Sequence, residues 1–221
     1  MDERTQDPLF GACGVAYVLL TLAAVVLGAI GGRTFATISS SPTQIAHDLA
    51  KPAGNLVWAA AYLDLLSAGF FLAFAVWACA KLGGGLLGAI ARAAATSYAA
   101  VGVAALAVGD AIEYRSGHGI GVQLGSALIT INEALYVGTW FLSVFFLLAA
   151  GPLALSTGRR ALGWSAIGTA ATTLVLTATS IDNLGQMANF LWLIWIVSAS
   201  ITLARGKHAP AAGMLATPQR A

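Results

Sequence analysis

The sequence predicts an all-α, polytopic integral membrane protein, built as a bundle of six transmembrane helices. Three observations predict this class. Of the 221 residues, 58% are hydrophobic and only 9% are charged, and the mean hydropathy is +0.82. A soluble domain carries roughly 25% charged residues, so this chain has too few to cover a water-facing surface. It also contains a series of apolar runs that reach the length of about 20 residues needed to cross a bilayer.

Each apolar run is assigned to one span. The first, "FGACGVAYVLLTLAAVVLGAI", exceeds the apolar core of about 7–15 residues typical of a signal peptide, so we expect a retained span. All runs are expected to be helices, because lipid tolerates only structures that satisfy their own backbone hydrogen bonds. The predicted domain covers residues 9–205, between a cytoplasmic tail at 1–8 and a disordered cytoplasmic tail at 206–221. Its spans are 10–30, 56–80, 85–112, 122–150, 161–180 and 186–204.

A short helix is predicted in the longest loop, "SPTQIAHDLAKP". Ser41 can cap it, Pro42 suits its first turn, and Pro52 ends the run. Ile45 and Leu49 are four residues apart and therefore share one face. We expect this helix to lie on the membrane surface.

The orientation follows from Lys and Arg, which are enriched in cytoplasmic loops. Eight of the 11 fall on the side that the two termini share. Both termini are therefore predicted to be cytoplasmic, in a multi-pass protein of the cell membrane. Cys13 and Cys79 would then lie near the reducing face as two small buried hydrophobic residues, and no disulfide framework is expected.

The acidic residues follow a pattern of their own. Asp2, Glu3 and Asp7 are expected to form a solvated cluster in the N-terminal tail. All six acids beyond this tail are predicted in the outer half of the membrane or near its midplane. Asp64 and Glu133 lie deepest, at roughly 12–17 Å. A carboxylate at a helix centre costs on the order of 2.5–3.5 kcal/mol, and such residues face the bundle interior or a water-filled cavity. The other four are Asp48, Asp110, Glu113 and Asp182.

Polar and aromatic neighbours accompany Glu133 on its helix. Tyr136 and Trp140 follow it on one face, and Asn132 shares a face with Tyr136. A hydroxyl stripe is predicted on the fifth span, and Gln186, Asn189 and Trp192 form a polar stripe on the sixth. The candidate ligand-binding or proton-binding residues are Asp64, Asp110, Glu113, Asn132, Glu133, Tyr136, Trp140 and Asp182.

Each candidate also has a structural explanation. Asp64 and Glu133 would then hold two helices together by a hydrogen bond, and would titrate as a coupled pair if they were close. Asp110 and Glu113 would be solvated helix ends. Hydroxyl stripes in membrane helices are commonly packing surfaces or interhelical hydrogen bonds.

Two stretches resemble a known family. The segment from Ser41 to Leu82 contains the outer amphipathic segment and the sequence Asp64-Leu65-Leu66, and "GRRALGWSAIGTA" contains a basic turn before Leu162-Gly163. Both resemble the domain-of-unknown-function 4386 family of six-helix bacterial membrane proteins, over residues 9–205. The chain departs from the family where a Pro is expected, since Arg159, Arg160 and Ala161 stand there. The resemblance implies the fold and brings no activity.

Three functions remain open. The protein could bind or translocate a small ligand, cation or proton through an outward-facing acidic pocket. It could instead be a membrane enzyme acting on a lipid or isoprenoid, with a protonated carboxyl as general acid and Trp140 or Tyr136 stabilising a carbocation. The third function is an accessory or sensing subunit with structural acids. Whether it is an enzyme, and its oligomeric state, are left open. No metal site, cofactor or nucleic-acid partner is predicted; the expected partner is the lipid bilayer.

Overall fold

The computed structural model describes residues 3–32, 37, 39–179 and 185–205, and within them every regular element is a helix. This confirms the all-α prediction. Six of the helices in these ranges are long and apolar enough to cross a membrane. The elements are α1 (Glu3–Ile30), α2 (Pro42–Leu49), α3 (Asn55–Leu82), α4 (Gly85–Arg115), α5 (Val122–Ser156), α6 (Arg160–Thr179) and α7 (Gly185–Arg205), and all but α2 are candidate spans.

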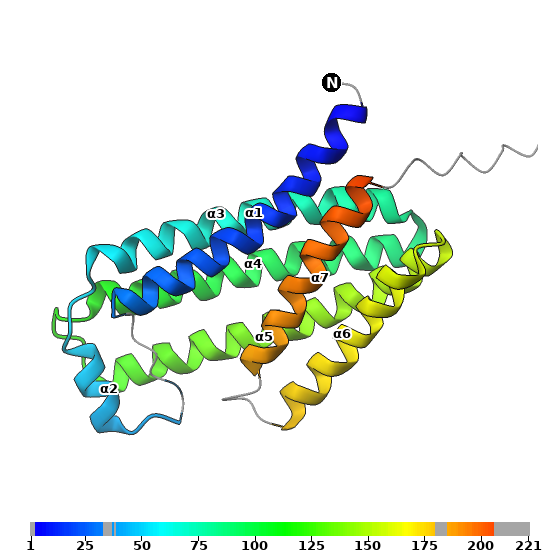
Figure 1. The fold of residues 1–221 in the computed structure, drawn as a ribbon. Helices are drawn as coiled ribbons and strands as arrows, with labels where there is room; N and C mark the ends of the chain where they lie inside the picture. Colours follow the sequence, from blue (N-terminus) through cyan, green and yellow to red (C-terminus); the bar gives the residue numbers. More distant parts are fainter. Residues whose placement is uncertain (1–2, 33–36, 38, 180–184, 206–221) are drawn as a thin grey trace, which may run out of the picture.

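The six long helices form a closed ring. Each one packs on the next in the order α1, α3, α4, α5, α6, α7, and α7 packs back on α1. The helices α3, α5 and α7 also touch one another inside the ring. In Figure 1, α3, α4 and α5 run nearly parallel, whereas α6 and α7 are tilted across them. This arrangement brings residues from the two ends of the chain together in the core.

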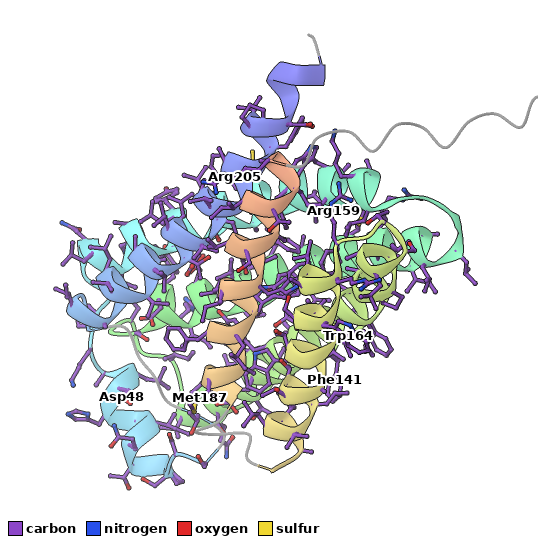
Figure 2. The ribbon with its side chains drawn as sticks, turned by 45° about the vertical axis from the view of Figure 1, so that its right-hand side comes forward. Asp48, Phe141, Arg159, Trp164, Met187 and Arg205 are labelled. Atoms are coloured by element: carbon purple, nitrogen blue, oxygen red, sulfur yellow. The ribbon has the colours of Figure 1, made fainter. Side chains whose placement is uncertain are left out.

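The two ends of the bundle differ in charge. We call the end that carries α2 the α2 end, and the opposite end, with Lys81, Arg159, Arg160 and Arg205, the basic end. Figure 2 shows Asp48 and Met187 at the α2 end and Arg159 and Arg205 at the basic end. The helix α4 reaches the α2 end with its carboxyl terminus, where Asp110 and Glu113 lie.

Helix bounds agree with hydropathy except where tertiary contacts extend them. The helix α1 begins at Glu3 rather than near residue 10. The expectation of a solvated acidic tail is wrong for Asp7, because both carboxylate oxygens lie 2.8 Å from Lys81 Nζ and Oδ1 accepts a hydrogen bond from Trp77 Nε1 at 3.2 Å. Only 14% of the Asp7 side chain is exposed. These contacts extend α1 alongside the end of α3.

The short helix α2 forms where its sequence predicts. Ser41 Oγ accepts a hydrogen bond from the Gln44 amide at 3.2 Å, and Pro42 occupies the first turn. Its apolar face does not lie open to the membrane surface. Ile45 and Leu49 are buried against α4 and α5, in a cluster with Ile112 and Ile129. The Gly117 amide also donates to the Leu49 carbonyl at 2.8 Å, so α2 is held by protein rather than by lipid.

The basic half of the bundle is filled by large apolar side chains. Those least accessible to solvent lie on α3, α5 and α7: Phe71, Phe74, Leu82, Phe146, Leu147, Ile196 and Leu203. A glycine allows the close approach of α1 to its neighbours, because a Cβ at Gly14 would collide with Ser200 Oγ and come within 2.7 Å of Phe74 Cδ2. Packing of this kind drives helix association where lipid offers no hydrophobic gain.

Candidate functional site

A buried hydrogen-bond network crosses the middle of the bundle. The Trp192 Nε1–H donates to the Tyr17 hydroxyl at 3.2 Å, and the hydroxyls of Tyr17 and Tyr98 lie 3.0 Å apart. Tyr17 and Trp192 are 5% and 3% exposed. The network thereby joins α1, α4 and α7. Polar atoms in an apolar interior are costly unless they are hydrogen-bonded, so these three side chains depend on one another.

Aromatic rings pack directly around this network. The ring of Phe71 lies 4.8 Å from that of Tyr98, 5.2 Å from that of Tyr17 and 5.7 Å from that of Trp192, measured between centroids. Trp192 continues the cluster by stacking on Trp195 at 6.1 Å. Separations of 4.5–7 Å are those of rings in contact. We refer to Tyr17, Phe71, Tyr98, Phe146, Trp192 and Trp195 as the aromatic floor.

Asp64 lies on the side of this floor nearer the α2 end. It is nine residues from the start of α3, which corresponds to about 13 Å along the helix. It precedes Phe71 by seven residues on α3, so the two share one face of the helix, and the Phe71 ring packs on that of Tyr17. Its backbone carbonyl accepts a hydrogen bond from Ser67 Oγ at 2.7 Å. The predicted deep acid therefore lies about two helical turns from the buried network, on the side of the α2 end.

Glu133 lies at a similar level on α5, 11 residues from its start, or about 16 Å along the helix. Glu133 Oε2 and Asn132 Oδ1 are both shielded from solvent, and Asn132 Oδ1 has no hydrogen-bond partner among the described residues. Tyr136, at 38% exposure, turns further outward, and Trp140 is half-buried. The spacing predicts that Glu133, Tyr136 and Trp140 all face the bundle interior. In the structure this holds only in part, because Tyr136 is exposed and Trp140 is half-buried.

Glu113 does not fit its structural explanation as a solvated helix end, and it stays a candidate residue. As a solvated helix end it would be exposed, yet it is only 5% exposed, while Asp110 is half-buried. Both stand where the end of α4 is covered by α2 and the turn that follows α4. Asp48 lies on α2, where both carboxylate oxygens accept from Gln44 Nε2 at 3.0–3.1 Å. Asp182 lies outside the described residues.

The two predicted polar stripes turn inward only in part. On α7, Trp192 is buried but Asn189 is exposed, so the stripe prediction is wrong for Asn189; the Gln186 side chain lies outside the described part of the chain. On α6, Thr173 is buried, whereas Ser165 and Thr172 are exposed. Steps of three residues rotate a helix by 300°, so a stripe built from them drifts off one face.

Sequence reasoning missed Tyr17 and Tyr98 as site residues. The signal that would have found them is a tyrosine far from either end of a membrane span. At such a depth a hydroxyl has no water to bond to, so it needs a protein partner. The identity of that partner is set by tertiary contacts 81 and 175 residues apart in the chain.

No protein-family model, no curated protein and no solved structure matches the chain. The resemblance to the domain-of-unknown-function 4386 family stays a prediction. The residues around Asp64 and the aromatic floor are therefore the basis for any statement about function.

Proposed function

We propose that the protein binds a small cation or proton that enters from the α2 end and is held at mid-bundle by Asp64, with Glu133 at the same level. The observation that carries the proposal is the depth of Asp64 on α3, seven residues before Phe71, whose ring packs on that of Tyr17. The Tyr17 hydroxyl is in turn hydrogen-bonded to Tyr98 and Trp192.

The distribution of acids supports entry from the α2 end. Asp48, Asp110 and Glu113 stand at that end and Asp64 and Glu133 lie below them. Among the described side chains, Asp7 is the one acid at the basic end, and it is bound to Lys81. Acidic side chains inside a membrane domain mark ion pathways and proton relays. A cation would therefore meet attractive charge along this half of the bundle.

Large side chains fill the half of the bundle nearer the basic end. In this conformation the structure therefore favours a protein that binds the cation over one that forms an open pore. Phe71, Phe74 and Phe146 are each 0% exposed, and side chains at such density leave few gaps as large as a water molecule. Passage to the basic end would require the helices that hold the floor to move. Translocation would then follow from a change in the packing of α1 or α7.

The orientation is part of the same proposal. Lys and Arg cluster at cytoplasmic ends of spans, and the basic end carries Lys81, Arg159, Arg160 and Arg205. We infer that the α2 end faces outward. The protein would then sit in the cell membrane with its acidic half open to external ions.

The test is a thermal-unfolding titration of the purified protein in lipid nanodiscs, against pH and against Na⁺, K⁺ and Ca²⁺. The wild type should gain stability with the bound species, because a ligand that binds only the folded state stabilises it. Asp64→Asn should lose most of that response, and Glu133→Gln should weaken it. Tyr62→Phe, on α3 and 70% exposed, is the control and should respond like the wild type. An unaltered response in both Asp64→Asn and Glu133→Gln would refute the proposal.

A further inference from the structure

Two basic side chains at the α2 end have no carboxylate partner in the described part of the chain. Lys51, which follows α2, and Arg115, the last residue of α4, are both exposed. Among the described residues, neither forms a salt bridge; Asp48 instead accepts hydrogen bonds from Gln44 and lies 3.3 Å from His47. Lys and Arg cluster at the cytoplasmic ends of spans. That cluster lies at the basic end, so the rule does not explain these two cations.

A close backbone contact brings the two cations to one place. The Gly117 amide donates to the Leu49 carbonyl at 2.8 Å, and a Cβ at Gly117 would lie 2.9–3.0 Å from the atoms of Pro52. Lys51 stands between Leu49 and Pro52 in the chain, and Arg115 precedes Gly117 by two residues. Neighbouring Cα atoms are 3.8 Å apart, so both long side chains start near this contact and can reach one anion.

Aromatic rings and helix length place these cations at the level of the lipid headgroups. The ring of Tyr114 contacts that of Trp58 at 6.3 Å and stacks on that of His118 at 6.0 Å, measured between centroids. Tryptophan and tyrosine rings with exposed edges lie at the membrane–water interface. The 31 residues of α4 extend about 46 Å, and a bilayer with its headgroups measures about 40–45 Å. Arg115, at the end of α4, therefore lies among lipid phosphates.

A small cavity opens beside the two cations. Its volume is about 260 Å³, and its walls include Ala46, Leu49, Ala50, Gly117, Gly119 and Val122. Lys51 directly follows one of these wall residues, and Arg115 is two residues from another. Sites for drug-sized ligands measure about 300–1,000 Å³. The cavity is therefore large enough for the polar part of a lipid headgroup and too small for acyl chains.

We propose that the α2 end binds the headgroup of an anionic phospholipid of the adjoining leaflet, with its phosphate held by Lys51 and Arg115. The positive charge of the two side chains complements a phosphodiester. The rest of the headgroup occupies the cavity. The acyl chains run along α3 over Tyr62 and Leu66, which follow Trp58 at four-residue steps and are 70% and 56% exposed. A lipid fits better than a soluble anion because the cations lie at headgroup depth above this apolar face. The inference does not depend on a cation at Asp64.

The experiment is hydrogen exchange of the full chain in a neutral detergent, titrated with phosphatidylglycerol, which is anionic. In the wild type the lipid should slow exchange of the amides of residues 116–121 severalfold. The double variant Lys51→Gln/Arg115→Gln should need at least about ten times more lipid for half of that effect, since one cation near a lipid surface contributes roughly fivefold. Arg115→Lys should stay close to the wild type, because lysine also binds phosphate.

The matched control removes two exposed cations from the other end of the bundle. Arg160→Gln/Arg205→Gln should respond at residues 116–121 like the wild type. Phosphatidylcholine, which is zwitterionic, and inorganic phosphate at the same concentrations should slow exchange there much less than phosphatidylglycerol does.

Three results would overturn the proposal. Equal responses in the wild type and in Lys51→Gln/Arg115→Gln would mean that the two cations do not hold the lipid. Equal slowing by phosphatidylcholine would mean that the charge of the headgroup is not recognised, and equal slowing by inorganic phosphate would identify a soluble anion as the partner. The single variants Lys51→Gln and Arg115→Gln, each with a shift of about fivefold, keep the test decisive if the double variant does not fold.

Discussion

The indole N–H of Trp192 donates to the hydroxyl of Tyr17 at 3.2 Å, and this single hydrogen bond links the first and last helices of the bundle. Both residues are almost completely buried. Because α7 closes the ring on α1, the bond lies at the closure point of the fold. The stability of the closed ring should therefore depend on it.

Trp192→Phe should lower the free energy of unfolding by about 1–2 kcal/mol. The loss combines one buried hydrogen bond, worth roughly 0.5–1.5 kcal/mol net, with the smaller ring. Unfolding in a detergent titration with sodium dodecyl sulfate measures it. Trp164→Phe is the control, since Trp164 is 64% exposed and its replacement should change little. Equal losses in the two variants would contradict the role given to the hydrogen bond.

Gly14→Ala should destabilise the contact of α1 with α3 and α7 by about 1–3 kcal/mol, the range for overpacking a filled core. Its Cβ would collide with Ser200 Oγ and press on the Phe74 ring. Gly69→Ala is the matched control, because no atom lies within 4 Å of a Cβ there. The control should be neutral or slightly stabilising. The same unfolding titration distinguishes them, and an indifferent Gly14→Ala would contradict the close approach.

The pair of Asp7 and Lys81 should show a measurable coupling. Their side chains are 14% and 22% exposed, so the pair lies between surface ion pairs, worth about 0.2–1 kcal/mol, and buried pairs, whose disruption costs about 3–5 kcal/mol. A double-mutant cycle of Asp7→Asn and Lys81→Met should give about 1 kcal/mol or more. Arg160→Met, at an exposed position, should show no coupling to Asp7→Asn.

Gly125→Val should loosen α2 without unfolding the bundle. A Cβ at Gly125 would collide with the Leu49 side chain, which holds α2 against α5. Hydrogen exchange of the α2 amides should become severalfold faster, while exchange in α3 and α5 is unchanged. Gly121→Val supplies the comparison, because a Cβ at Gly121 meets nothing within 4 Å. Unaltered exchange in Gly125→Val would mean that other contacts suffice to hold α2.

The orientation predicts which thiols react from outside the cell. With Cys13 and Cys79 replaced by Ala, Lys51→Cys at the α2 end should react with a membrane-impermeant maleimide in intact cells. Arg160→Cys at the basic end should react only after the membrane is opened. Both positions are exposed, so access depends on the side of the membrane. The reverse pattern would place the acidic half in the cytoplasm.

The sequence by itself determined the helices. Five of the six predicted spans begin within one residue of a helix, because length and apolarity are what a bilayer selects. It also determined α2, since Ser41, Pro42 and the pair of Ile45 and Leu49 act locally. The deep positions of Asp64 and Glu133 followed from counting along those helices.

Only the tertiary structure decided which faces turn inward. Lipid is as apolar as the protein core, so a membrane helix needs no apolar stripe and its sequence carries little trace of its buried side. The inward stripe on α7 was wrong for Asn189 for this reason, and the sequence could not decide between a buried and a solvated position for Glu113. Asp7 is part of α1 and not of a solvated tail, because it is bound by Lys81 and Trp77 on α3. Tyr17 contacts Trp192 because α7 packs back on α1. No local sequence pattern predicts that contact.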